Sequence, residues 1–426
     1  MLPPGPRFPV PVQTLGWITR PGPFMERCRD RYGDAFTLRL QNEDTWVMLS
    51  DPAAVKQVFT GDPKLLHAGE AAGILRPILG PNSVLLLDER AHMTQRKLLL
   101  PPFHGERMKA YGELMTGVAE AEIASWPAGE VIPTRPAMQR ITLEIVMRAI
   151  FGVSDGGGLE RMRDALRAML DWTTDPSRLV FLVAAGPKHM GRLPAFRRVM
   201  GALDELLAEE VARRRTVPDL AERDDVLSML LQARHEDDGS PMTDPELRDE
   251  LLTLLAAGHE TTATALSWAL ERLARHPVAW ARLREDDEAY VDAVIKETLR
   301  LRPVIPAVLR RLKAPMEIGG FDLPAGVSAV PCIYLLHRRP DLYPDPLAFR
   351  PERFLERPAG TYTWIPFGGG VRRCLGASFA QFEMATVLRV LARRCERLEP
   401  DTLVPERTAR RSISLVPARE GRVLVA

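Results

Sequence analysis

The stretch from Pro366 to Gly376, PFGGGVRRCLG, decides how this sequence is interpreted. Three glycines and two arginines precede a single cysteine, Cys374, and the chain then continues into ASFAQFEMATVLRVLARRC (377–395). The apolar spacing of that second stretch predicts a long amphipathic helix. A cysteine just before a helix has its thiolate stabilised by the partial positive charge and free N–H groups of the helix start. Cys374 is therefore a candidate metal ligand.

Other interpretations of this loop were weighed against that one. Cys374 could be an inert buried cysteine, which composition alone would favour. The glycines could form a phosphate-binding loop, but the Lys-Ser/Thr that should follow them is missing, and the preceding TYTWIP opens no βαβ unit. The neighbouring arginines can bind carboxylates through forked hydrogen bonds. One thiolate with carboxylate-binding arginines is what a haem iron and its propionates require.

Composition limits the function classes. The chain has 426 residues, 46% of them hydrophobic, and a formal net charge of +1, which gives no indication of a nucleic-acid partner. The four cysteines form no C-x-x-C pair, so disulfides or a zinc cluster are not expected. Residues 1–12, MLPPGPRFPVPV, are proline-rich and predicted to be extended, unlike a signal peptide. The longest apolar run, near Leu179–Gly186, is shorter than the about 20 residues that a membrane span needs. We expect a soluble, cytoplasmic protein without a membrane anchor.

The pattern along the chain predicts a mainly helical fold with a small β region, in one domain over residues 1–426. AFTLRL (35–40) and TWVMLS (45–50) alternate like paired strands, and DPAAVKQVFTG (51–61) is typical of a capped helix. Helical periodicity dominates from about residue 90 to 276, and strand-like or irregular sequence returns from about 304 to 370.

One predicted helix is unusually long. It begins with a capping box between Thr243 and Glu246 and continues until Pro277, roughly 50 Å at 1.5 Å per residue. Its middle reads AGHETT (257–262), with a helix-weakening glycine and with Glu260 among mostly apolar residues. Two interpretations stay open: a packing glycine with an exposed glutamate, or a local opening that admits a small molecule and delivers protons.

These stretches together resemble the cytochrome P450 superfamily of haem-thiolate monooxygenases. Residues 367–376 fill every specified position of F-x-x-G-x-R-x-C-x-G. Glu297-x-x-Arg300 with Arg353 is similar to the family's structural Glu-Arg-Arg triad. AGHETT resembles its oxygen-activation motif, and AHMTQRKLLLPPF (91–103) its first propionate-binding helix. The resemblance implies a single haem-enclosing domain with a long central helix.

The resemblance also implies roles for individual residues. Cys374 would be the thiolate ligand of the iron in haem b, and Phe367 would shield its sulfur. Thr261 would hydrogen-bond bound dioxygen or its water, and Glu260 would connect that site to a proton supply. The remaining implied cofactor-binding residues are His92, Arg96, Arg310 (rather than Arg311), Gly368, Arg372 and Gly376.

The implied reaction inserts one oxygen atom of O2 into a substrate, with electrons from a separate donor, a ferredoxin with its reductase. Arg373, Arg389, Arg393 and Arg394 could form a cationic face for that donor, or only a solvated helix face. Three segments similar to family pocket regions are rich in aliphatic residues, namely 69–87, 177–190 and 304–309, and they point to a hydrophobic substrate such as a fatty acid, terpenoid or steroid-like molecule. Ordinary core packing would explain the same residues.

Rival functions are a peroxide-using haem-thiolate peroxygenase or isomerase, a non-catalytic haem sensor, and a helical scaffold without a cofactor. The family's peroxide-using relatives commonly lack the acid–threonine pair, so Glu260-Thr261 favours the monooxygenase.

Overall fold

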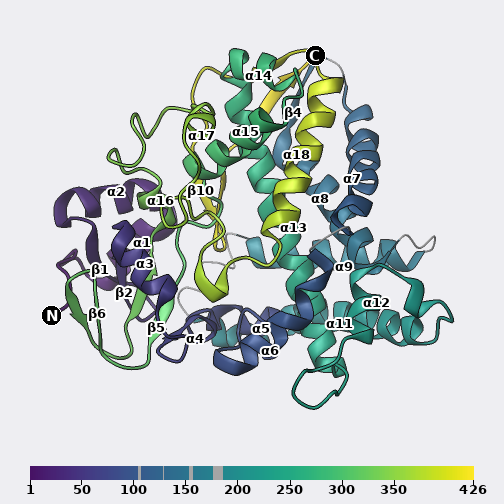
Figure 1. Cartoon of the computed structure of the whole chain (residues 1–426), viewed down its shortest axis with the longest axis horizontal. Helices are drawn as coiled ribbons and strands as arrows, with labels where there is room; N and C mark the ends of the chain where they lie inside the picture. The colour runs from purple at the N-terminus through teal and green to yellow at the C-terminus, as the bar shows by residue number, and fades with distance from the viewer. Residues whose placement is uncertain (104–106, 128, 153–156, 176–185) are drawn as a thin grey trace. The chain divides into compact units, whose positions relative to one another are not determined.

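The structure, a computed structural model, describes residues 1–103, 107–127, 129–152, 157–175 and 186–426 (Figure 1). The chain divides into two compact units. The first unit is Met1–Leu66, Gly112–Thr142 and Glu260–Ala426, and the second is His67–Tyr111 and Leu143–His259. Three of the crossings between them fall inside helices α7 (Arg107–Ala124), α8 (Thr134–Phe151) and α13 (Asp244–Ala274) rather than in a linker. The single domain expected from the sequence stays a prediction.

The first unit holds most of the strands. Its other helices are α1 (Val10–Thr19), α2 (Pro21–Tyr32), α3 (Pro52–Thr60), α14 (Pro277–Leu283), α15 (Glu288–Leu301), α16 (Ile333–Leu336), α17 (Arg353–Glu356), α18 (Ala377–Arg394) and the 3-10 turn η5 (Gly370–Arg372). Its strands are β1 (Ala35–Arg39), β2 (Thr45–Leu49), β4 (Glu130–Pro133), β5 (Arg310–Leu312), β6 (Met316–Ile318), β7 (Phe321–Leu323), β8 (Ser328–Pro331), β9 (Leu398–Pro400), β10 (Thr408–Arg411), β11 (Ser414–Pro417) and β12 (Arg422–Val425), and β3 (Leu66–His67) lies at its boundary.

The largest sheet is built around two strands that are far apart in sequence. Its order is β1-β2-β8-β5-β3, with β1 and β2 antiparallel as predicted and β2 parallel to β8. Successive side chains of a strand point to opposite faces. Trp46 and Met48 therefore enter one apolar cluster with Trp17 and Phe36, whereas Val47 and Leu49 enter another with Val55 and Phe59. The alternating TWVMLS segment is thus buried on both faces.

The predicted helix boundaries in this unit hold because their caps form. Asp51 accepts a hydrogen bond from the Ala54 backbone N–H (2.9 Å) at the start of α3. Helix α18 begins at Ala377, directly after the glycine loop. One boundary was wrong: the extended N-terminal segment ends at Pro9, because α1 begins at Val10 and Pro11 fits the first turn of a helix.

The second unit is helical. Its elements are α4 (Ala68–Ala71), α5 (Arg76–Leu79), α6 (Glu89–Leu99), α9 (Gly157–Thr174), α11 (Pro194–Arg215) and α12 (Val226–Gln232), with the 3-10 turns η1 (Gly73–Leu75), η2 (Pro101–Phe103), η3 (Pro187–Arg192) and η4 (Leu220–Glu222). Of the predicted pocket segment 177–190, residues 177–185 lie outside the described part of the chain.

Helix α13 confirms the long helix predicted from the sequence. The Thr243 N–H donates to Glu246 (2.8 Å), and the Glu246 N–H points back to the Thr243 hydroxyl (3.4 Å), which completes the capping box. The helix runs without interruption through AGHETT.

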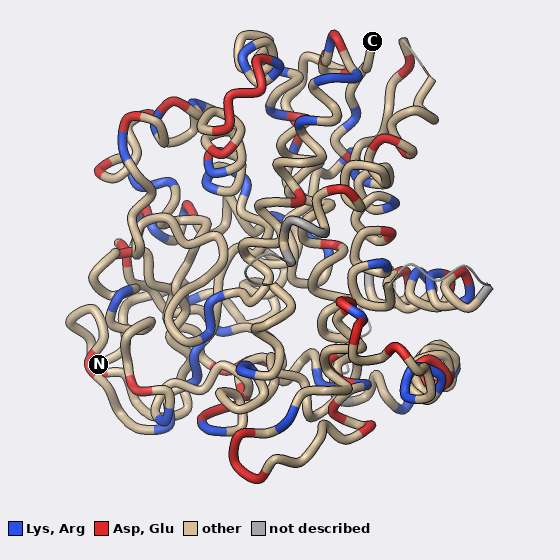
Figure 2. Tube along the Cα trace, turned by 45° about the vertical axis from the view of Figure 1, so that its right-hand side comes forward, with Lys and Arg blue, Asp and Glu red and all other residues tan. Residues whose placement is uncertain are grey.

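Charge and apolar length set limits on the surface. Positive and negative residues are interspersed along the described chain (Figure 2), in keeping with the net charge of +1. Within the described ranges, no helix combines the length and the apolar character that crossing a bilayer requires.

Candidate active site around Cys374

The loop before Cys374 needs glycine for its backbone. Gly368 and Gly370 have φ of +68° and +65°, a conformation that side chains disfavour. A Cβ at Gly370 would also lie 2.1 Å from the Phe59 carbonyl oxygen at the end of α3. The loop closes when the Cys374 N–H donates to the Phe367 carbonyl (3.0 Å). The glycines therefore let a tight loop pack on α3 and present Cys374.

Cys374 differs from the other cysteines in exposure. All four cysteines lie among the described residues, and only Cys374 is exposed. Burial raises the pKa of the Cys28 and Cys395 thiols to about 11 and that of the Cys332 thiol to about 12. A buried thiol held in its protonated form is a poor metal ligand, because the ligand is the thiolate. Cys374 is thus the one thiol of the chain placed to bind a metal.

The segment that leads into this loop is anchored to α15. His337 is fully buried, and burial, followed by the charges of Arg300 and Arg338, lowers its pKa well below the usual value. Its neutral ring can therefore accept the hydrogen bond that the Ile365 N–H donates to Nε2 (2.9 Å). Trp364 donates to the Lys296 carbonyl (3.1 Å) and meets the Phe367 ring edge-on at 6.1 Å. These contacts hold Phe367 next to the cysteine loop.

Glu297, Arg300 and Arg353 form a buried ionic cluster. Glu297 and Arg300 have no exposed side-chain surface. Arg300 donates to Glu297 through Nε (2.6 Å) and Nη2 (2.8 Å), and Arg353 Nε donates to the same carboxylate (3.0 Å). Arg300 also donates to three backbone carbonyls, those of His337, Pro346 and Ala348. The triad thus joins α15 to the segment 337–353 as scaffold, which is the part it plays in the sequence interpretation.

The predicted propionate-binding arginines divide between the units. Arg310 is buried on β5, donates to the Leu309 carbonyl (2.8 Å) and lies 5.9 Å from the Phe59 ring centroid. Arg311, the next residue, is paired with Asp44 (2.8 Å). Arg372 lies in η5, in the same unit as Cys374 and Arg310. His92 and Arg96, one turn apart on α6, belong to the second unit.

Glu260 has partners that the sequence did not reveal. Arg135 Nη1 donates to its Oε1 (2.8 Å), and Gln139 Nε2 donates to its Oε2 (2.5 Å). Arg135 is itself buried, and its Nη2 lies 3.8 Å from Glu420 Oε1, a carboxylate that is 40% exposed. The interpretation of Glu260 as an exposed glutamate is wrong, because its side chain is only 16% exposed and both oxygens are bonded. Arg135 and Gln139 are one turn apart on α8, and that spacing of polar residues was the one signal available in the sequence.

Thr261 follows Glu260 at a change in the environment of α13. Thr261 is half-buried, whereas every residue from Thr262 to Ala274 is buried. Its hydroxyl therefore lies where the helix still has accessible surface, directly beside the Glu260 carboxylate in sequence.

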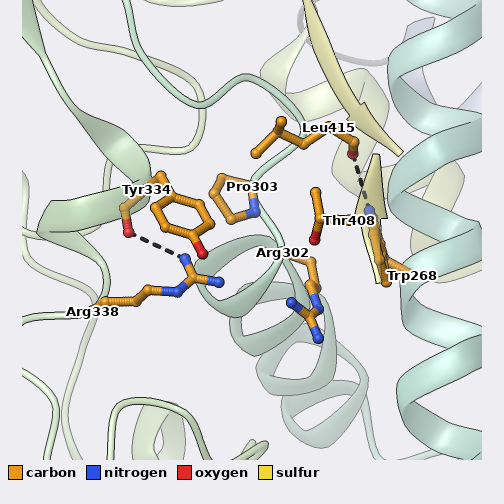
Figure 3. Close-up of a pocket in the computed structure, with 7 residues that line it drawn as sticks. All are labelled: Trp268, Arg302, Pro303, Tyr334, Arg338, Thr408 and Leu415. Atoms are coloured by element: carbon orange, nitrogen blue, oxygen red, sulfur yellow. Dashed lines mark hydrogen bonds between the residues drawn. The ribbon is translucent and has the colours of Figure 1, made fainter. Parts of the chain in front are cut away.

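The first unit also contains a small cavity away from the predicted site residues (Figure 3). It is lined by Trp268, Arg302, Pro303, Tyr334, Arg338, Thr408 and Leu415, none of them a predicted site residue. Arg338 lies 3.6 Å from the Tyr334 ring centroid, and Arg302 lies 4.8 Å from the Trp268 ring. The cavity has essentially no room even for a water-sized molecule, whereas ligand pockets measure about 300–1,000 Å³, so we assign it no substrate.

The predicted cationic face is largely neutralised. Arg389 pairs with Asp286 (2.9 Å), Arg393 approaches the same carboxylate (4.0 Å), and Arg394 pairs with Glu120 (3.3 Å). Arg373, next to Cys374, is exposed. The arginines of α18 therefore form a mostly paired helix surface and not a strong cationic patch.

Comparisons with known proteins find matches that extend over essentially the whole chain. The family profile described as Cytochrome P450 matches residues 3–425. Cytochrome P450 135B1 of Mycobacterium tuberculosis is 44% identical, over 100% of this chain and 91% of that protein. Cytochrome P450 138 of Mycobacterium bovis is 39% identical, over 100% and 96%. The solved structure of retinoic acid bound cyanobacterial CYP120A1 superposes with a TM-score of 0.85 at 25% identity, covering 100% of this chain and 99% of that one.

Proposed function

Because the chain belongs to the cytochrome P450 family, we propose that it is a haem-thiolate monooxygenase that inserts one oxygen atom of O2 into a hydrophobic small molecule. The observation that carries the proposal is the exposure of Cys374, in a glycine-shaped loop at the start of α18, while the other three thiols are buried.

The residues of the loop fit a haem. Cys374 would ligate the iron, Phe367 would cover the sulfur, and the turn conformations of Gly368 and Gly370 would keep the backbone clear of side chains. Arg310 and Arg372 would bind a propionate, His92 and Arg96 on α6 are proposed as propionate-binding residues from the resemblance alone, and Gly376 would end the loop at α18. When bound, a thiolate-ligated haem supplies the activation of dioxygen.

Glu260 and Thr261 would handle protons. Arg135 and Gln139 each donate one hydrogen bond to Glu260, one to each carboxylate oxygen, and the remaining lone pairs of the carboxylate would take up a proton and pass it toward the Thr261 hydroxyl. Glu420, partly exposed and close to Arg135 Nη2, gives the guanidinium a second carboxylate to turn to. This part of the proposal rests on contacts within the first unit.

The substrate and the electron donor belong to the same proposal. The aliphatic segments 69–87 and 304–309 support an apolar substrate of the fatty acid, terpenoid or steroid-like class, and the related structure that holds retinoic acid supports the same class. We propose a separate ferredoxin with its reductase as the donor, with exposed Arg373 as a contact beside Cys374. The paired arginines of α18 would then contribute little, and the rate of electron transfer should depend only weakly on ionic strength.

The carbon monoxide spectrum of the reduced protein tests the thiolate. Wild type should show the long-wavelength band of a thiolate ligand, and Cys374→His should shift it to an imidazole-type spectrum. An imidazole-type spectrum in wild type would overturn the proposal.

Turnover assays separate the rival functions. With a ferredoxin system and O2, Thr261→Ala should consume reductant without forming an equal amount of product. Equal product formation from hydrogen peroxide alone would instead indicate a peroxygenase, and a Thr261→Ala variant without any functional change would indicate a sensor.

A further inference from the structure

Helix α1 buries two polar residues and leaves part of its apolar surface facing outward. Its buried residues are Gln13, Thr14 and Trp17. Trp17 is buried and Ile18 packs against the core, but other apolar side chains face outward: Val12 is 50% exposed and Leu15 is 61% exposed, and Phe8 just before the helix is 58% exposed. A surface helix normally buries its apolar stripe. The outward residues Phe8, Val12 and Leu15, spaced four and three apart, are called the α1 apolar face below.

Hydrogen bonds fix which side of helix α1 faces outward. Gln13 Nε2 donates to the carbonyls of Phe8 (2.8 Å) and Pro6 (3.2 Å), and Gln13 Oε1 accepts from the Arg39 N–H (3.0 Å) of β1. Thr14 Oγ1 accepts from the Gln41 N–H (2.8 Å). Because the N-terminal segment, β1 and the turn after it satisfy these buried polar groups, turning the helix over would leave the groups that pair with β1 and its turn without partners. The α1 apolar face is therefore held outward by these hydrogen bonds.

The surroundings of this face carry positive charge. From Phe8 to Thr19 the chain has no charged residue, and the exposed residues Arg7 and Arg20 flank that stretch. Arg39, also exposed, lies on β1 beside Gln13. The neighbouring turn carries Glu43 and Asp44, and Asp44 is paired with Arg311 (2.8 Å). Arginines at both ends of an apolar stretch complement the negative charge of anionic lipid headgroups.

The size of the face favours a lipid surface over a second copy of the chain. A whole buried aromatic side chain covers about 150–250 Å². Three side chains that are about half exposed therefore offer a few hundred Å² at most, below the about 800 Å² per partner of a stable protein interface.

We propose that the α1 apolar face is a peripheral contact site for an anionic lipid surface. The helix would lie in the interface plane without crossing it, with Phe8, Val12 and Leu15 among the lipid chains and with Arg7 and Arg20 on the headgroups. Such contact would place the enzyme where hydrophobic molecules are concentrated, and it does not depend on the proposed reaction.

Flotation of the haem-loaded protein with vesicles tests this proposal. Wild type should float with vesicles that contain phosphatidylglycerol, and less with phosphatidylcholine alone or in high salt. The triple variant F8S/V12S/L15S should lose about tenfold or more of the binding. R7E/R20E should lose mainly the preference for the anionic lipid.

A matched control removes equally exposed apolar residues elsewhere. V278S/L347S/L403S changes side chains that are 81%, 69% and 92% exposed, and it should bind vesicles like wild type. Retention of the haem band and of the thermal midpoint in F8S/V12S/L15S shows that the fold is intact. Failure of wild type to float, equal loss in the control, or a dimer of wild type that the triple variant abolishes would each overturn the proposal.

Discussion

Replacing Glu297 by glutamine should strongly destabilise the protein. Its carboxylate accepts four hydrogen bonds: two from Arg300 (2.6 and 2.8 Å), one from Arg353 Nε (3.0 Å) and one from the Arg350 backbone N–H (2.8 Å). Glutamine has nearly the same size, but it has no charge and offers one acceptor oxygen instead of two. The substitution leaves two buried guanidinium groups without their counter-charge.

The size of the stability loss in Glu297→Gln follows from the burial of its carboxylate. Because Glu297 and Arg300 have no exposed side-chain surface, water does not compensate for the lost charge. Removing one partner of a buried ion pair costs about 3–5 kcal/mol. A control on the same helix is Asp292→Asn, which breaks the i,i+4 pair with Lys296 but affects a carboxylate that is 48% exposed. That pair should contribute less than about 0.5 kcal/mol.

Urea unfolding of the haem-loaded proteins measures the difference, because urea, unlike guanidinium, does not screen charge. Far-ultraviolet circular dichroism and haem absorbance should give the free energies of unfolding, with coincidence of the two curves as the check on a two-state transition. Both variants change the net charge equally, so the difference between them reports burial and the lost hydrogen bonds and not net charge. An E297Q free energy within about 1 kcal/mol of that of D292N would refute the reasoning.

Three further predictions concern other parts of the chain. Burial raises the pKa of Glu250 from 4.5 to about 8, so between those pH values the folded protein holds a proton that the unfolded chain has released. The stability of the wild type should therefore fall by up to about 1.4 kcal/mol per pH unit in that window. Thermal melts across the window should show this slope for the wild type and not for E250Q. Gly370→Ala should lower the stability by about 1–3 kcal/mol or more, because the residue has φ of +65° and its Cβ would meet the Phe59 carbonyl. Gly117→Ala on α7, where there is open space, should be neutral or stabilising. Equal shifts of the melting temperature in the two variants would contradict the loop geometry. Glu260→Gln should lower the ratio of product to reductant consumed while Glu420→Gln lowers it less, and a larger effect at Glu420 would place the proton path elsewhere.

Local features of the sequence determined much of the architecture. The α13 capping box, the α3 cap at Asp51, the β1–β2 hairpin and the glycine loop before α18 all depend on residues that are neighbours in the chain. Hydrogen bonds between near neighbours and the periodicity of apolar residues are visible in a sequence, and the order of the motifs was enough to indicate the family.

Contacts between distant residues were decided only by the tertiary structure. Glu260 is bonded by Arg135 and Gln139, more than one hundred residues earlier, and no local pattern states which arginine a carboxylate will meet. Exposure is likewise a property of packing: the loop sequence singled out Cys374, but only the fold shows that Cys374 is exposed and that the other three cysteines are buried. Helix α1 shows the same limit, because the hydrogen bonds of Gln13 and Thr14 with β1 and its turn fix which side of the helix faces out. Burial and long-range hydrogen bonding arise only when separate segments pack together, and for that reason composition and spacing could not predict them.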